Sequence, residues 1–414
     1  MKGYTYKKYK NLGVWVKESL CPEFSDAQLQ DYCLQLFSKE NNPAIIKEGT
    51  YKKIFTAKIH TTPGIVKIYR SPGFLRQLKT FFSPSRAMRE FQAAAYVYHK
   101  GIPTAEPLLL AERKKWGCVQ EGLVAVRFIE EAQELRDFLF YEKNIALSEK
   151  RKIITEFGRL TDKIFKNGIF QYDYALNNFM IRKDGERRQL YFIDFEKVTI
   201  NKEPSSAQQL DILARLNRVG REVSPRDRLR FLRGYSGAGS ARTKEVLALA
   251  RTLQKETIQA LKKDVGRSRL TSIYTHARYD RIKLSSYAGL CRKGHLPQEI
   301  INKIKNIPAG RHQVEISLTA GQPAALLKAL QFSGDEAGKM WAAMSVLIIA
   351  GAPLELPHVL IEDSRRGFLL FPVSASGQFE NFTRGESSRC NFIKTNFPEE
   401  FAKIKRMAQG LGKC

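Results

Sequence analysis

The segment from residue 171 to residue 195 constrains this chain most, because two short apolar strands there carry polar residues at their ends. Asp173 and Asn178 have the spacing D-x-x-x-x-N, directly after a helical pattern and directly before the strand NFMIRK. The next strand, LYFIDF, contains Asp194 at its end, and Asp184-Gly185 marks the hairpin turn between the two strands. A carboxylate at the end of an apolar strand is costly unless it is paired or binds a metal. The segment therefore predicts a functional site.

These residue types suit phosphoryl transfer. That reaction needs a cation on the phosphates, carboxylate and amide ligands for Mg²⁺, and a carboxylate that orients the acceptor hydroxyl. Asp173 can accept the hydrogen bond of an incoming hydroxyl, and Asn178 and Asp194 can reach a metal. The alternative is structural: Asp173 and Asn178 satisfy the backbone of a turn, and Asp194 caps the turn that follows.

The cation of such a site is predicted to be Lys67, which lies on the predicted strand Ile65–Ile68. Glu90 follows on the next predicted helix, where it can pair with Lys67 and direct it at phosphate. Taken singly, Lys67 is an edge residue and Glu90 a surface residue. The order of all these residues along the chain, each in the matching kind of element, argues against coincidence.

The order of predicted elements indicates an α+β fold with two lobes. Residues 1–40 are expected to form an extension that ends in a helix capped by Ser25 or Asp26. A strand-rich region with one helix follows, and helices dominate after about residue 131. Strand patterns cover 44–59, 64–70, 107–113 and 122–129, and helix patterns cover 85–101, 148–168 and 205–260.

Residues 44–240 resemble the eukaryotic-like protein kinase superfamily, whose VAIK, αC glutamate, HRDxxxxN and DFG motifs place the same residue types in the same order. The resemblance implies a bilobal kinase-like fold. Its N-lobe would cover 41–130 and its C-lobe 131–264, after the N-terminal extension over 1–40.

Several positions depart from the motifs of that superfamily. The Gly-rich loop is reduced to a segment with one glycine, around Lys47 and Gly49. Gln171 and Tyr172 replace the histidine and arginine of HRD, and Glu196 replaces the glycine of DFG. No APE motif is found. The loss of the arginine and of APE argues against a phosphorylation-activated protein kinase.

A closer resemblance is to the bacterial lipopolysaccharide kinase family, which includes core heptose kinases and Kdo kinases. It is carried by SRAMREFQAAAYVYHKGIPTAEPLLL, FIDFEKV and LDILARLNRVGREVSPRDRLRFLRGY. It implies ATP and Mg²⁺ as cofactors, Asp173 as the catalytic residue, and Asn178 and Asp194 as metal ligands. The residues expected to bind the nucleotide are Lys67, Glu90, Lys47 and Gly49. The acceptor implied is a sugar hydroxyl on an anionic, lipid-linked glycan.

Three other functions remain open from the residues. The reduced Gly-rich loop favours a pseudokinase that binds nucleotide or a partner without catalysis. A protein kinase or a small-molecule kinase of the aminoglycoside type is the alternative within the same class. The third, a nucleic-acid-binding protein, is prompted by charge alone, and since no recognition motif supports it, no specific nucleic acid is expected.

An internal repeat indicates a second, degenerate and truncated kinase-like N-lobe over 265–414. Residues 91–117 and 341–367 align without a gap and share glycines and prolines that fix a helix stop and a strand entry. Met340 stands in place of Glu90, and no counterpart of Lys67 is evident. Because no catalytic loop follows, this copy is not expected to be an enzyme by itself. The alternative is two unrelated helix–turn–strand units.

Charge and targeting signals bear on partners and location. The net charge of +27 predicts anionic partners such as phosphates, nucleic acid or an acidic membrane. Without an apolar secretory segment or paired cysteine motifs, a cytoplasmic protein is expected. Peripheral contact with the cytoplasmic face of the inner membrane is a further expectation. It draws on the mixture of aromatic and basic residues over 70–86. The alternative, which the residues favour slightly, is a loop that packs its aromatics on the N-lobe.

Overall fold

Two units make up this chain in a computed structural model: unit 1 comprises residues 1–216 and 225–250, and unit 2 comprises 217–224 and 251–414. Each unit is described by itself. The structure describes residues 1–38, 44–71, 77, 80–142, 145–185, 187–218, 223–237, 243–266, 279–284, 287–292, 297–305, 307, 313–318, 325–333, 336–349, 359–362, 366–372, 394–395 and 398–411. The predicted aromatic and basic residues over 72–76 and 78–79 lie outside these ranges.

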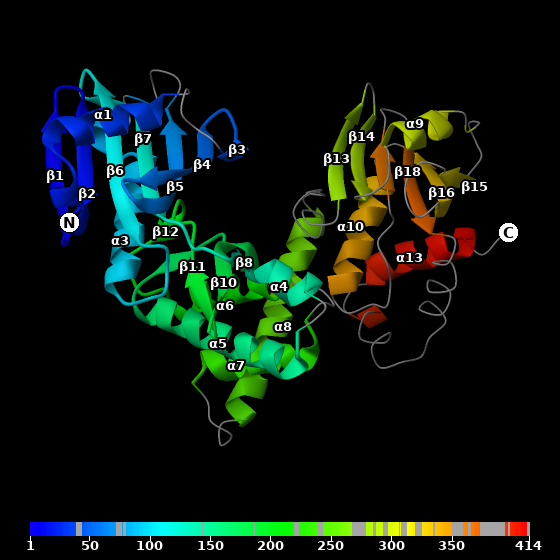
Figure 1. The fold of residues 1–414 in the computed structure, drawn as a ribbon. Helices are drawn as coiled ribbons and strands as arrows, with labels where there is room; N and C mark the ends of the chain where they lie inside the picture. The colour runs from blue at the N-terminus through cyan, green and yellow to red at the C-terminus, as the bar shows by residue number, and fades with distance from the viewer. Residues whose placement is uncertain are drawn as a thin grey trace. The chain divides into compact units, whose positions relative to one another are not determined.

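A seven-stranded antiparallel sheet forms the first part of unit 1, in the order β1-β2-β6-β7-β5-β4-β3 (Figure 1). Its strands are β1 (Tyr4–Tyr9), β2 (Leu12–Lys17), β3 (Ala44–Glu48), β4 (Lys52–Ile59), β5 (Thr62–Arg70), β6 (Pro107–Lys115) and β7 (Cys118–Arg127). The five later strands confirm the predicted strand patterns. Strands β1 and β2 were not predicted, and the description of residues 1–40 as an extension is wrong in this respect. Val14 and Val16 lie at alternate positions of β2, and both are buried. Strand β2 pairs with β6 as part of the sheet.

Two helices pack on opposite faces of this sheet. Helix α1 (Asp26–Phe37) begins at a capping box, in which Ser25 accepts from the Gln28 backbone, and it packs on the face that contains Leu109. Helix α3 (Arg86–His99) begins at Ser85, as predicted, and packs on the face that contains Leu110 and Val124. Because neighbouring residues of a strand point to opposite faces, the residues of β5 on the Val124 side meet helix α3.

The helical part of unit 1 is built around α5 (Leu147–Lys166), which confirms the predicted helix over 148–168. It is accompanied by α4 (Leu135–Tyr141), α6 (Ser206–Leu216) and α7 (Pro225–Tyr235). The predicted hairpin is strands β10 (Phe179–Asp184) and β11 (Arg187–Phe192), joined through Gly185. The short strands β8 (Ala132–Glu134), β9 (Phe170–Gln171) and β12 (Val198–Thr199) complete this part, with β8 beside β10 and β9 beside β12.

Helices α5 and α7 cross with almost no space between their backbones. A Cβ atom on Gly158 would lie 2.1 Å from the carbonyl oxygen of Phe231, and one on Gly234 would lie 2.1 Å from that of Thr155. We expect Gly158→Ala to lower the free energy of unfolding by about 3 kcal/mol, because neither backbone can move without separating the helices. Chemical denaturation measures this, with Arg151→Ala on the exposed side of α5 as the control. A change below about 0.5 kcal/mol for Gly158→Ala would contradict the close crossing.

Unit 2 contains a six-stranded antiparallel sheet in the order β13-β14-β17-β18-β16-β15. Its strands are β13 (Tyr279–Leu284), β14 (Tyr287–Arg292), β15 (Gln313–Leu318), β16 (Ala325–Ser333), β17 (Val359–Glu362) and β18 (Arg366–Pro372). Its helices are α9 (Pro297–Lys305), α10 (Glu336–Ile349) and α13 (Pro398–Leu411), and helix α8 (Thr243–Gly266) has residues in both units. Taken in chain order, these strands occupy the same sheet positions as β1, β2, β4, β5, β6 and β7 of unit 1. Helices α9 and α10 follow the same strands as α1 and α3.

Candidate active site

The centre of the site is an ion pair between Lys67 on β5 and Glu90 on α3. Lys67 faces Val124 in the strand register, on the side of the sheet that α3 covers. Its Nζ atom lies 2.6 Å from Glu90 Oε1, and the Glu90 side chain is only 3% exposed. The hydroxyl of Tyr69 donates to the other oxygen of Glu90, so both oxygens of this buried carboxylate are satisfied. The structure thus brings together two residues that the sequence predicted as a pair.

Asp194 is the second carboxylate beside Lys67. The Lys67 Nζ atom lies 3.7 Å from Asp194 Oδ1, a buried atom that accepts no hydrogen bond from the described residues. Asp194 has φ 64°, in the left-handed region that few residues other than glycine adopt. A strained backbone at a polar residue is typical of functional sites, where the surrounding structure holds it. The predicted strand ends at Phe192, and Asp194 therefore lies just beyond it.

The charges of Lys67 and Asp194 stabilise each other. Burial acts to lower the pKa of Lys67, but the carboxylates of Glu90 and Asp194 outweigh it and hold that pKa above its ordinary value. Burial acts to raise the pKa of Asp194, but Lys67 and Lys52 outweigh it and hold that pKa below its ordinary value. A raised lysine pKa and a lowered aspartate pKa keep both side chains ionised throughout the neutral pH range. The site therefore presents a fixed cation next to a fixed carboxylate.

A second cation reaches this network from strand β4. Lys52 Nζ lies 3.1 Å from Glu196 Oε2 and 5.2 Å from the centre of the Tyr69 ring. Glu196 was identified from the sequence only as a replacement for a motif glycine, and the role of Lys52 was missed. The two residues are far apart in the sequence, and no local sequence pattern predicts that they pair.

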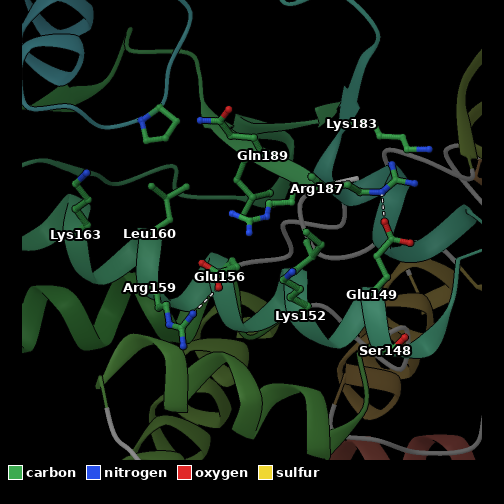
Figure 2. Close-up of a pocket in the computed structure, with 14 residues that line it drawn as sticks. Ser148, Glu149, Lys152, Glu156, Arg159, Leu160, Lys163, Lys183, Arg187 and Gln189 are labelled. Atoms are coloured by element: carbon green, nitrogen blue, oxygen red, sulfur yellow. Dashed lines mark hydrogen bonds and ion pairs between the residues drawn. The ribbon is translucent and has the colours of Figure 1, made fainter. Parts of the chain in front are cut away.

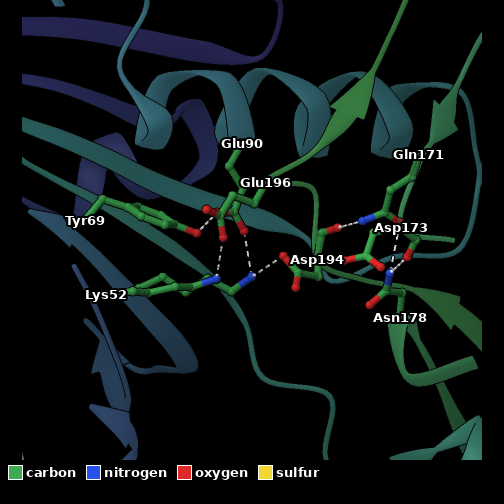
Figure 3. A network of polar contacts seen from close by, with 9 residues as sticks. Lys52, Tyr69, Glu90, Gln171, Asp173, Asn178, Asp194 and Glu196 are labelled. Atoms are coloured by element: carbon green, nitrogen blue, oxygen red, sulfur yellow. Dashed lines mark hydrogen bonds and ion pairs between the residues drawn. The ribbon is translucent and has the colours of Figure 1, made fainter. Parts of the chain in front are cut away.

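Gln171 connects Asp194 to the D-x-x-x-x-N segment, as Figure 3 shows. Its amide nitrogen donates to the carbonyl oxygen of Asp194 at 3.0 Å, and its amide oxygen accepts from Asn178 Nδ2 at 3.1 Å. Asn178 Nδ2 also donates to the backbone carbonyl of Asp173 at 2.6 Å. Gln171 is 3% exposed, so the connection is buried and uses both ends of its amide. Sequence reasoning noted Gln171 but assigned it no role, although a buried glutamine usually needs such partners.

Asp173 is the most accessible carboxylate of the set, with 71% of its side chain exposed. Its partner is Lys197, whose Nζ atom lies 3.5 Å from Asp173 Oδ2 and whose side chain is 67% exposed. An exposed pair of this kind contributes little to stability. It leaves a carboxylate that a substrate hydroxyl can approach from solvent, which is the property required of a residue that orients an acceptor.

Asn178 and Asp194 have the donor atoms that Mg²⁺ prefers. Both amide hydrogens of Asn178 are engaged, which leaves its side-chain oxygen as the group available to a metal. The buried Oδ1 atom of Asp194 also lacks a hydrogen bond from described residues. Among the residues that the structure describes, no group of three or more His, Cys, Asp or Glu side chains is gathered for a metal. Mg²⁺ commonly binds one or two carboxylates together with substrate phosphates and water, so the residues present fit that ion.

Lys47 and Gly49 were predicted to contact the nucleotide, and they do not join this network. Lys47 is exposed on β3, the strand at one edge of the sheet, and Gly49 lies in the following turn, where its N–H donates to the Lys52 carbonyl. In the described part of the chain, neither has a hydrogen bond or ion pair to Lys67, Glu90 or Asp194. Their contact with a nucleotide stays a prediction.

A separate hollow of about 950 Å³ lies between helix α5 and the β10–β11 hairpin (Figure 2). Its walls are strongly basic, with Lys152, Arg159, Lys163, Lys183, Arg187 and Arg188 among the lining residues. Glu149 pairs with Arg188 and Glu156 with Arg159, each at 2.5 Å. None of the seven predicted catalytic, nucleotide-binding or metal-binding residues lines this hollow, so it is distinct from the site around Lys67.

Comparison with known proteins points to one family. The profile of the lipopolysaccharide kinase (Kdo/WaaP) family matches residues 46–235, which include Lys67, Glu90, Asp173, Asn178 and Asp194. Among solved structures, the chain is similar to WaaP in a complex with acyl carrier protein, with a TM-score of 0.43 and 16% sequence identity. That match covers 59% of this chain and 98% of the other. No curated protein sequence matches the chain.

Proposed function

We propose that this chain, whose residues 46–235 belong to the lipopolysaccharide kinase (Kdo/WaaP) family, phosphorylates a sugar hydroxyl of lipopolysaccharide core or a related glycolipid with ATP. The observation that carries the proposal is the continuous network around Lys67 and Asp194. Through Gln171 and Asn178, it connects a buried cation and two carboxylates to the backbone of Asp173. These are the residue types that phosphoryl transfer uses. We also propose that the protein acts in the cytoplasm, at the cytoplasmic face of the inner membrane.

Each residue has a distinct role in the proposed reaction. Lys67, held by Glu90, binds the α and β phosphates of ATP through its charge. Asp173 accepts the hydrogen bond of the sugar hydroxyl and takes its proton as the hydroxyl oxygen bonds to the γ-phosphorus. The bond between that phosphorus and the β–γ bridging oxygen breaks, and ADP leaves. Gln171 keeps the Asp194 backbone and the Asn178 side chain in position throughout.

Asn178 and Asp194 would hold Mg²⁺, which when bound neutralises the charge of the phosphates. Asp194 is suited to this role because its pKa lies below the ordinary value and its Oδ1 atom accepts no hydrogen bond from described residues. Lys67 stays beside Asp194 and fixes the orientation of the carboxylate.

Purified protein with ATP, Mg²⁺ and lipopolysaccharide core oligosaccharide tests the proposal. We expect phosphate transfer to the acceptor and a loss of about 100-fold or more in kcat for Asp173→Ala, since a positioned acid–base group contributes about that factor. Asp184→Ala, in the exposed turn of the β10–β11 hairpin, is the control. Transfer that survives in Asp173→Ala would refute the role of this residue. A screen of peptide and aminoglycoside acceptors in the same assay would identify a different kinase class.

A pseudokinase that binds nucleotide is the second candidate, and the position of Lys47 and Gly49 favours it. A kinase Gly-rich loop covers the phosphates, whereas this segment has one glycine and, among the described residues, no hydrogen bond or ion pair to Lys67, Glu90 or Asp194. Thermal shift with and without Mg²⁺-ATP, combined with the transfer assay, separates the two functions. Stabilisation by nucleotide without transfer to any acceptor would establish the pseudokinase.

We also propose that unit 2 is a degenerate copy of the kinase N-lobe without catalytic function. In unit 1, Leu110 pairs with Val124, which pairs with Lys67. In unit 2, the corresponding pairs are Leu360 with Leu369 and Leu369 with Leu330, so Leu330 occupies the register position of Lys67. Met340 occupies the position of Glu90 on the equivalent helix. Leu330 and Met340 line one hollow of about 330 Å³, where two apolar side chains stand in place of the ion pair.

A further inference from the structure

Three aromatic side chains protrude from one end of the unit 1 sheet. Phe81, Phe82 and Trp116, which we term the aromatic tip, are 63%, 81% and 86% exposed. The rings of Phe81 and Phe82 have centres 5.2 Å apart, and Phe81 lies against Gly117, the residue after Trp116. The tip therefore joins a short helical segment before α3 to the turn between β6 and β7.

Hydrogen bonds hold the two parts of the tip together without burying its rings. Thr80 Oγ1 accepts from the Val119 backbone at 2.9 Å. Gln120 Nε2 donates to Gln77 Oε1 at 2.9 Å. Both contacts fix the helical segment to strand β7 while the neighbouring aromatic rings stay in solvent. Phe81 and Phe82 are exposed and do not pack on the N-lobe, contrary to the alternative for these two residues, while Phe74 lies outside the described ranges.

The backbone of Trp116 is unfavourable for a tryptophan. It has φ 50° and is followed by Gly117 with φ 77°, in a two-residue turn closed by the Lys115–Cys118 pair. Turns with two positive φ values favour Asn-Gly, and a bulky residue at the first position is an outlier. Burial does not offset this cost, because the indole is the most exposed of the three rings. A contact outside the chain would offset this cost.

The surroundings of the tip are basic. Lys115 Nζ lies 4.7 Å from the centre of the Trp116 ring, and Lys114 is its neighbour on the same strand. Arg86, at the start of helix α3, is exposed close in sequence to Phe82. Tryptophan beside lysine is the combination found where proteins meet lipid headgroups, because the ring enters the interface and the cation attracts acidic lipids.

We infer that the aromatic tip inserts into the headgroup region of a bilayer that contains anionic phospholipid. In the described ranges, no helix is long and apolar enough to cross a membrane. Three exposed rings contribute apolar contact, and the neighbouring cations together with the +27 net charge contribute attraction to the surface. The inference does not depend on phosphoryl transfer, although a lipid-bound acceptor would be reached from the same surface.

Vesicle sedimentation of the full chain, without nucleotide, tests the inference. We expect binding to vesicles of phosphatidylglycerol and phosphatidylethanolamine, and at least about tenfold weaker binding for Trp116→Asn combined with Phe82→Ser. Asn suits the turn, so the variant retains the fold. Leu147→Ser, which removes an apolar side chain of 68% exposure at the start of α5, is the matched control.

Two results would overturn the inference. One is vesicle binding by the variant equal to that of the unaltered protein. The other is that the unaltered protein does not bind vesicles but self-associates through the tip. Size-exclusion chromatography would then show a smaller species for the variant than for the unaltered protein. A further variant, Lys115→Glu, tests the electrostatic attraction to the membrane, and we expect it to bind the anionic vesicles more weakly. Since transfer to a soluble acceptor is measured separately, failure of the kinase proposal and failure of this inference are distinguishable.

Discussion

Replacing Asp194 with asparagine is expected to lower phosphoryl transfer by about 100-fold or more while the protein stays folded. The substitution removes the charge that pairs with Lys67 and that would bind Mg²⁺, and loss of one such electrostatic contact typically costs that factor. Asparagine tolerates the left-handed backbone conformation, with φ 64°, better than most residues. The effect should therefore be catalytic, and circular dichroism should show an unchanged fold.

Measurement of ADP release at increasing Mg²⁺ concentration checks this expectation. The variant should need more Mg²⁺ and should not regain the full rate at saturation. Asp184→Asn removes a carboxylate from the exposed hairpin turn near the same strands and serves as the control. An Asp194→Asn protein within twofold of the original rate would remove Asp194 from the proposed mechanism.

The second large effect is expected for Lys67→Met, which should lower both the transfer rate and stability. Without the ammonium group, the carboxylate of Glu90 remains buried at 3% exposure with Tyr69 as its hydrogen-bond donor. Removing one partner of a buried ion pair costs about 3 kcal/mol or more. We expect the rate to fall about 100-fold as well, because the phosphates lose their cation.

A double variant separates these two consequences. Lys67→Met combined with Glu90→Gln no longer leaves a buried charge at position 90, and Asp194 keeps the attraction of Lys52. Its stability should therefore recover most of the loss, whereas its activity should not. Thermal unfolding and the transfer assay measure the two quantities on the same samples. Glu121→Gln, which weakens a pair with Arg113 elsewhere on the sheet, is the control. Recovery of activity in the double variant would refute phosphate binding by Lys67.

Much of the site was predictable from the sequence because its parts lie in short segments with clear local patterns. Lys67 was placed on a strand and Glu90 on a helix, and their pairing followed from the order of those elements. Gln171 was harder, because its role depends on a contact with the backbone of Asp194 that no spacing encodes. Lys52 and Glu196 are distant in sequence and meet only through folding. Strands β1 and β2 were also missed, and the pairing that brings them into the sheet, between β2 and β6, joins segments remote in the chain.

The shared strand order of the two sheets has a consequence for how the chain folds. Strands β5 and β16 occupy the same sheet position, so during folding each has a wrong sheet available as well as the right one. The residues at the shared register position distinguish them. Lys67 next to Met340 would be a buried cation without a partner, and Leu330 next to Glu90 would leave a buried carboxylate without a cation. The ion pair proposed to bind phosphate thus also marks to which sheet each strand belongs.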